Sequence, residues 1–331
     1  MALLDAARRA GYAFEVICGY PGNIVRVVDH DASGFIFQTW PGFLTLQRRD
    51  DYARLTDKPA QKLLLAEVGL PAPRLLACLA ADDDVGEVLE SAPVSFPCVV
   101  KPCIGTYSRW VFTHIQTRRL LRMAVERIAA SGHRVLVEQQ IEGAHYRVLC
   151  VGGVLAGCVE RRPPRVTGDG ERTVAELVTE RNHEPGRDGS CEDGLLHPIV
   201  IDRAAEAYLR QQGYTPESVP PPGTAVALNR LVTGLAGADF IDASDRIHPE
   251  TVRLCETFAR RHRLFIAGFD LITPAIDRSI RDVGAINEVN VREVDATCIE
   301  QCNVGKRRPV SSYVWERLPF DRIAATSCPI W

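Results

Sequence analysis

The 331-residue sequence lacks an excess of either charge, since 39 lysines and arginines stand against 42 aspartates and glutamates. Nucleic-acid coats and polybasic membrane binders need a clear basic excess, so the balance argues against both classes. The chain also lacks the roughly 18–20 consecutive apolar residues of a membrane-spanning helix. The longest candidate, residues 148–159, contains a glycine pair and is better interpreted as two strands around a turn. Residues 1–10 have no apolar segment typical of a signal peptide, so we expect a cytoplasmic protein.

Cysteine is abundant, but the pattern of a disulfide framework is missing. The eleven cysteines include no C-x-x-C pair. The nearest pairs are Cys98/Cys103, Cys150/Cys158 and Cys298/Cys302. Disulfide frameworks are typical of small exported domains, whereas this chain is long and has no export signal. We therefore expect reduced thiols packed as small apolar side chains, and no spacing favours a zinc site.

The remaining composition is that of a folded protein of about two domains, with 46% hydrophobic and 24% charged residues. Helices are predicted over residues 2–10, 57–68, 116–130, 171–181 and 202–212, and from Pro249 onward. Strands are predicted over 13–18, 97–101, 134–138, 146–151, 154–160, 264–272 and 284–291. Hairpins alternate with helices without a steady βαβ rhythm, which predicts an α+β fold. The polar, glycine-rich segment 183–194 is interpreted as a surface loop or as a lid over a site.

Two polar residues near the carboxyl end share one face of a predicted strand. Glu288 and Asn290 are two residues apart, so strand alternation places their side chains on the same side. The preceding strand places a third polar residue, Asp270, inside an apolar run, where a carboxylate is costly unless it is paired or bound to a metal. Carboxylate and amide oxygens suit Mg²⁺, although a solvated strand face is the alternative.

A lysine follows another apolar strand, in the segment Val99-Val100-Lys101-Pro102-x-x-Gly105. A lysine is a point charge for phosphate, and backbone N–H groups in a glycine-containing turn can hold phosphate oxygens. The sequence contains no Walker-type phosphate loop. A further apolar strand leads into the polar segment 138–143, and neither segment is informative alone.

In their order along the chain, these segments resemble the ATP-grasp superfamily of carboxylate–amine ligases. The resemblance is strongest to the ATP-grasp domains of cyanophycin synthetase and of bifunctional glutathione synthetases. It extends over residues 10–295, through the segments 55–74 (LTDKPAQKLLLAEVGLPAPR), 146–170 (YRVLCVGGVLAGCVERRPPRVTGDG) and 242–249 (DASDRIHP). The resemblance implies an α+β ATP-grasp fold in which two subdomains grip ATP. It also implies a lead-in region over 1–55, a small lobe over 56–145 and a large lobe with the metal site and a tail over 146–331.

The resemblance also implies roles for single residues. Lys58, Lys101 and Gly105 would contact the ATP phosphates. The segment Glu138 to Ile141, including Gln140, would hold adenine, and His145 stands where the family has an acidic ribose partner. Asp270, Glu288 and Asn290 would hold Mg²⁺, or Mn²⁺ in its place. Arg161 would stabilise an acylphosphate or clamp a substrate carboxylate, and Arg147 would reach phosphate or substrate. Surface ion pairs are the alternative for both arginines.

The implied reaction joins a carboxylate to an amine, with an acylphosphate formed from ATP and with release of ADP and phosphate. Amino acids or short peptides are the implied substrates, and a homodimer is the default among relatives. Two alternatives stay open: a nucleotide-binding module of weak or absent activity, and a ligase that modifies a larger peptide.

The sequence departs from the family pattern in three places. After Gly105, Ser108 and Trp110 stand where glycines are expected, and a tryptophan is not expected to adopt a glycine's positive φ angles. Two interpretations stay open: Tyr107 or Trp110 contacts a substrate instead, or the loop holds phosphate less tightly. Residues 233–237 do not reproduce the family's N-x-S-T-G-G segment, which predicts a changed specificity. Residues 291–294 replace the usual x-x-P-G turn after Asn290.

Overall fold

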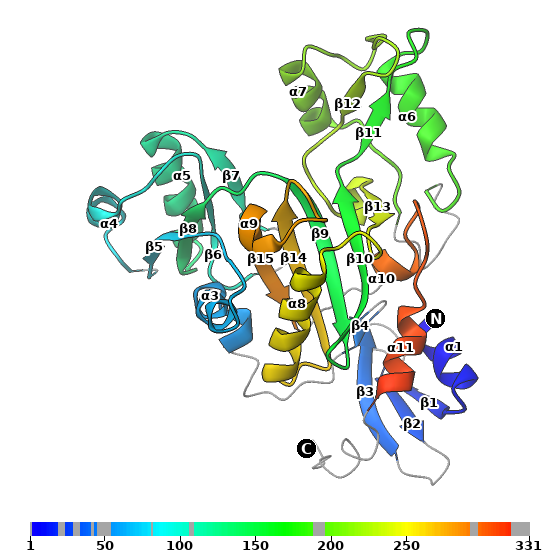
Figure 1. Ribbon diagram of the computed structural model, residues 1–331. Coiled ribbons are helices and arrows are strands. Elements are labelled where there is room, and N and C mark those ends of the chain that lie inside the picture. Colours follow the sequence, from blue (N-terminus) through cyan, green and yellow to red (C-terminus); the bar gives the residue numbers. More distant parts are fainter. Residues whose placement is uncertain are drawn as a thin grey trace.

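The computed structural model describes residues 2–18, 24–28, 34–40, 43–44, 54–80, 82–105, 109–187, 196–291 and 297–318. Within these ranges the strands form four sheets, and helices cover their faces (Figure 1). The arrangement is a mixed α+β fold, as the alternation of hairpins and helices predicts. No helix in the described part of the chain is long and apolar enough to cross a membrane.

The largest sheet has five antiparallel strands in the order β13–β10–β9–β14–β15. Their bounds are Asp239–Asp242, Val154–Arg162, Ala144–Val151, Ile266–Thr273 and Ala285–Asn290. Gly152 and Gly153 connect β9 to β10 with positive φ angles of 60° and 75°, which glycine adopts without steric cost. The apolar run 148–159 is therefore a hairpin, as predicted.

One face of this sheet is covered along its length by α8 (Pro249–Arg261), α9 (Ile280–Val283) and α3 (Lys58–Glu67). The fully buried Phe258 of α8 packs edge-to-face on Phe269 of β14, with 5.7 Å between ring centroids. On the opposite face, an apolar cluster joins one half of the sheet to α1 (Ala2–Arg9), α10 (Thr297–Glu300) and α11 (Val310–Arg317). Polar residues occupy the other half of that face.

A second sheet, β5–β8–β6–β7, lies beside the first (Figure 1). Its strands are Leu75–Leu79, Val135–Gln139, Cys98–Pro102 and Phe112–Ile115. Helices α4 (Val85–Ser91) and α5 (Arg118–Ala129) pack on one face through the buried Leu89, Leu121 and Val125. The other side of the central strands carries Lys101 and Glu138, which are 3% and 1% exposed. We call this unit the small lobe and the five-stranded unit the large lobe.

A small unit lies between β10 and β13 in sequence and projects from the large lobe (Figure 1). It pairs β11 (Arg165–Thr167) with β12 (Ala225–Ala227) and packs α6 (Val174–Asn182) and α7 (Arg203–Gln211) around a core of its own. Helix α6 begins at Val174, three residues after the predicted start. Thr173 caps it with Glu176 in a capping box, which holds the preceding residues outside the helix.

The amino-terminal strands β1 (Ala13–Cys18), β2 (Ile24–Val28), β3 (Gly34–Trp40) and β4 (Phe43–Leu44) form a separate antiparallel sheet. Helix α1 packs beside α11, and Tyr12 contacts Trp315 with 5.3 Å between ring centroids. The first and last described helices thus lie together on the large lobe (Figure 1).

Local signals account for the ends of α3. The Asp57 carboxylate accepts from the N–H of Ala60, Pro59 occupies the first turn, and Gly69 follows the helix with a φ of 74°. Eight cysteines are free, and all of them but Cys78 are buried: Cys78, Cys98, Cys103, Cys150, Cys158, Cys255, Cys298 and Cys302. Of the segment 183–194, residues 188–194 lie outside those ranges. Arg187, in the described part, is fully buried, and its Nη2 lies 2.5 Å from Asp239.

Candidate active site

The strand register of the large lobe brings the polar residues of the candidate site together on one face of its sheet. Arg147 of β9 is paired with Asp270 of β14, and Asp270 is paired with Glu288 of β15. In the adjacent row, His145 of β9 lies between Arg161 of β10 and Ile272 of β14. Four strands from distant parts of the sequence therefore bring their polar side chains to one half of one face.

Asp270 is the centre of a cluster of charged groups. Its Oδ1 lies 2.6 Å from Arg147 Nε and 3.2 Å from Arg161 Nη1, and Asn290 Nδ2 donates to its Oδ2 at 3.1 Å. Burial alone raises the pKa of Asp270, but the two guanidinium groups outweigh that effect, so its pKa lies below the ordinary value. The carboxylate predicted to need a partner thus has two, and Arg161 is further held by a hydrogen bond from Nε to the Val232 carbonyl.

Glu288 faces a lysine from the amino-terminal half of the chain. Lys58 Nζ lies 3.1 Å from Glu288 Oε1 and donates to the Gly105 carbonyl at 3.0 Å. Three predicted site residues from α3, β15 and the segment after β6 therefore meet at one ammonium group. Gln61, one turn further along α3, donates to the Val289 carbonyl and accepts from the Val289 N–H. These two bonds attach α3 to β15.

Lys101 extends from the small lobe to the same place. Its ammonium contacts Glu138 and donates to Asn287 Oδ1 at 3.0 Å. Glu138 also contacts Lys62, at 2.7 Å, so one carboxylate serves two ammonium groups. Burial by itself raises the pKa of Glu138, but Lys101 and Lys62 outweigh it and the net pKa is lowered. Burial lowers the pKa of Lys62, and Glu138 opposes that shift.

The segment predicted to hold adenine connects the two lobes. Gln140 Oε1 accepts from the backbone N–H of His114, and Gln140 Nε2 donates to the Ile141 carbonyl at 3.1 Å. Just after this segment, Gly143 packs closely against the large lobe: a Cβ atom at this position would lie 2.4 Å from the carbonyl carbon of Thr273. Burial lowers the pKa of His145; Asp270 opposes this effect and Arg161 adds to it. His145 is therefore a neutral imidazole at neutral pH.

The expectation that Trp110 avoids positive φ angles is wrong. Its φ angle is 60°, in the left-handed region that non-glycine residues seldom adopt. The indole is packed against the small-lobe core, and the guanidinium of Arg127 lies 5.0 Å from its ring centroid. Apolar burial and the cation–π contact offset the backbone cost, which is about 1–2 kcal/mol. Tyr107 and Ser108, like residues 292–294 after β15, lie outside the described residues.

Sequence reasoning assigned no role to two residues of this site. Lys62 follows Lys58 by one helical turn, so the i,i+4 spacing is the signal that predicts it on the same side of α3. Asn287 breaks the strand alternation that was used for Glu288 and Asn290. A bulge in the pairing of β14 with β15 places it there, and the sequence has no signal for that bulge.

The donor set fits a divalent cation that also has phosphate ligands. Asp270, Glu288 and Asn290 supply two carboxylates and an amide on adjacent strands. Mg²⁺ is commonly held by one or two carboxylates together with substrate phosphates and water. In the described part of the chain no group of three His, Cys, Asp or Glu side chains is arranged to enclose a metal alone. The residues therefore suit an ion that arrives with a nucleotide.

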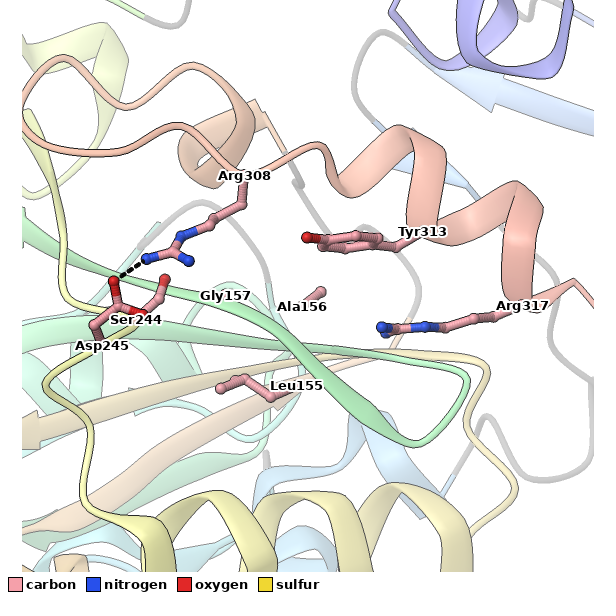
Figure 2. Close-up of a pocket in the computed structure, with 8 residues that line it drawn as sticks. All are labelled: Leu155, Ala156, Gly157, Ser244, Asp245, Arg308, Tyr313 and Arg317. Carbon is pink, nitrogen blue, oxygen red and sulfur yellow. Dashed lines mark hydrogen bonds and ion pairs between the residues drawn. The ribbon is translucent and has the colours of Figure 1, made fainter. Parts of the chain in front are cut away.

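A separate pocket of about 220 Å³ lies beside α11 (Figure 2). Tyr313 and Arg317 of α11 extend over residues 155–157 of β10, and Arg308 is ion-paired with Asp242 and Asp245. None of the residues of the candidate active site lines this pocket.

Comparison with known proteins gives relatives for most of the chain. Cyanophycin synthetase of a Nostoc species is 37% identical over 237 residues, which are 71% of this chain and 26% of that protein. The bifunctional glutathione biosynthesis protein of Clostridium perfringens is 31% identical over 48% of this chain and 20% of that protein. A crystal structure of the bifunctional glutathione synthetase from Pasteurella multocida superposes with a TM-score of 0.67, covering 95% of this chain and 42% of that one at 23% identity. No protein-family model matches the chain.

The chain is an ATP-grasp protein. It spans about a quarter of the length of the cyanophycin synthetases that it matches. In this ATP-grasp protein each of the site's carboxylates is paired with a lysine or arginine.

Proposed function

We propose that the chain is an ATP-dependent carboxylate–amine ligase. The observation that carries the proposal is the meeting of two lysines on β15: Lys58 of α3 contacts Glu288, and Lys101 of the small lobe contacts Asn287. Relatives named as cyanophycin synthetase and as glutathione biosynthesis proteins support the reaction class, and amino acids or short peptides are the proposed substrates. The division at residues 55/56 and 145/146 is proposed with it: strands β1–β4 precede the first boundary and β5–β8 precede the second, which falls at the start of β9.

The first chemical step transfers a phosphoryl group. An oxygen of the substrate carboxylate attacks the γ-phosphorus of ATP, the bond to the β,γ-bridging oxygen breaks, and ADP leaves. Little covalent help is needed in such a transfer, so catalysis rests on placing the reactants and offsetting charge. Lys58, Lys101 and the Gly105 segment would hold the phosphates. Asp270, Glu288 and Asn290 would hold Mg²⁺, which would supply positive charge to offset that of the phosphates.

The second step forms the amide. The amine nitrogen attacks the acyl carbon, the bond from that carbon to the phosphate oxygen breaks, and phosphate leaves with the proton that the amine gives up. Arg161 and Arg147, which both contact Asp270, would orient the acylphosphate by charge-assisted hydrogen bonds. The backbone of residues 138–141 would hold adenine, while the Glu138 side chain holds the two lysines. The neutral His145, in the row next to Arg147, would contact the ribose or substrate.

The test is phosphate release from Mg·ATP with paired amino acids and short peptides, combined with mass detection of the product. Release that requires both substrates, with a new amide in the product, supports the proposal. Glu288→Gln should lower turnover at least 100-fold by removing a carboxylate from the proposed metal set. The control is Glu142→Gln, whose side chain is 71% exposed. Binding of Mg·ATP without turnover over the whole panel would instead indicate a non-catalytic nucleotide-binding module.

A further inference from the structure

A β-bulge gives β15 an extra residue at the candidate site. Asp270 pairs with Glu288, but the next residue of β14, Leu271, pairs with Ile286, so Asn287 has no partner of its own. A bulge turns side chains away from the regular alternation. Asn287 is therefore free to reach Lys101, while its neighbour Glu288 reaches Lys58.

The contact of Asn287 crosses from one lobe to the other. Lys101 belongs to the small lobe and is 3% exposed, and its Nζ donates to Asn287 Oδ1 at 3.0 Å. An ammonium group has three N–H bonds. Glu138 and Asn287 accept two of them, and the described residues supply no third acceptor. The third N–H is the one available to a phosphate oxygen.

The charge balance shows why an amide suits this position. Glu138 carries one negative charge and contacts both Lys62 and Lys101, so the buried trio has one positive charge in excess. The amide oxygen of Asn287 orients the ammonium but adds no negative charge. A carboxylate at the same place would cancel the excess that attracts a triphosphate.

We propose that Asn287 is a positioning residue, which holds the Lys101 ammonium toward the nucleotide phosphates from the opposite lobe without neutralising it. This inference rests on the proposed nucleotide site. It assigns a role to a residue outside the set Asp270, Glu288 and Asn290, and it makes the orientation of the small lobe depend on β15.

The test is a double-mutant cycle on ATP affinity, measured by calorimetry. In Asn287→Leu, the leucine side chain is close in volume to that of asparagine but has no hydrogen-bond acceptor. The substitution should weaken Mg·ATP binding about 10- to 100-fold, the usual effect of losing a hydrogen bond to a charged group. In a Lys101→Met background the same substitution should change affinity by less than about 3-fold, because Asn287 acts through Lys101. Equal losses in both backgrounds would overturn the proposal.

A second variant tests the charge argument and covers a failure of Asn287→Leu to fold. Asn287→Asp keeps an acceptor for Lys101 but adds a negative charge, so it should weaken binding of metal-free ATP in EDTA about 10-fold or more. If the Asn287→Asp protein bound metal-free ATP as tightly as the unmodified protein does, the proposed role of the amide would be contradicted. The matched control is Gln211→Glu, an exposed amide-to-carboxylate change on α7, which should leave affinity unchanged.

The two proposals fail in distinguishable ways. If the unmodified protein binds no Mg·ATP, the nucleotide site itself is wrong, and the role of Asn287 falls with it. If the unmodified protein binds Mg·ATP and Asn287→Leu binds equally well while folded, the nucleotide site stands and only the role of Asn287 is refuted.

Discussion

Replacing Glu138 by glutamine removes the negative charge that Lys62 and Lys101 share. The glutamine has the same shape, so the packing of β8 is kept and the change isolates the charge. The side chain of Glu138 is 1% exposed, and those of Lys62 and Lys101 are 13% and 4% exposed. Both ammonium groups would then be buried without a counter-ion.

Breaking a buried ion pair by removing one partner typically costs about 3–5 kcal/mol of folding free energy. We expect Glu138→Gln to fall near the lower end, about 3 kcal/mol, because a lysine can release its proton in response. Burial already lowers the pKa of Lys62. A base with a lowered pKa in the folded state loses stability as pH falls, so the cost should be larger at pH 7 than at pH 9.

The assay is urea unfolding followed by circular dichroism at both pH values. Glu142→Gln, directly after the segment 138–141 that connects the lobes, is the control, and its free energy of unfolding should change by less than about 0.5 kcal/mol. A Glu138→Gln protein within 0.5 kcal/mol of the unmodified protein at pH 7 would refute the shared-charge argument. A cost that did not shrink at pH 9 would also contradict it.

Three further predictions concern packing and reactivity. Gln61→Leu should destabilise the fold by about 2–4 kcal/mol in urea unfolding, because it leaves the N–H and carbonyl of Val289 buried without their partner; an equal effect of the exposed Gln211→Leu would contradict this. Phe258→Ala should cost about 3–5 kcal/mol, because the ring is fully buried between α8 and β14, whereas Leu63→Ala, at a side chain 72% exposed on α3, should leave the unfolding midpoint nearly unchanged. Cys78→Ser should remove one fast-reacting thiol in titration with a disulfide reagent. Cys150→Ser should remove none, since burial raises the pKa of Cys150 to about 12. Equal losses in the two variants would show that the buried thiol is accessible.

Much of the fold is readable from local patterns. The glycine pair at 152–153 predicts the hairpin, and Asp57, Pro59 and Gly69 predict the bounds of α3. The alternation in Glu288-Val289-Asn290 places two polar side chains on one face, and the register confirms that they flank Asp270. These features depend on neighbours along the chain, so a sequence contains them directly.

The partners of each charged residue are not readable in this way. Lys101 and Asn287 are 186 residues apart, and their contact requires both the packing of the two lobes and a bulge. Trp110 is in a glycine-like conformation because Arg127 and the small-lobe core stabilise its ring, which local propensity does not include. Glu138 was assigned to adenine from its position in a motif, whereas its side chain is turned to Lys62 and Lys101.

The charged residues of the candidate site and the apolar cluster beneath α11 share one face of the five-stranded sheet. On β9, Arg147 is two residues from Leu149, and Leu149 is part of the dry cluster beneath α11. The strand that positions the Arg147 guanidinium therefore also packs against α1 and α11. We therefore expect substitutions that disturb the packing of α11 on Leu149 to shift Arg147, two residues away on the same strand, and so to affect the candidate active site.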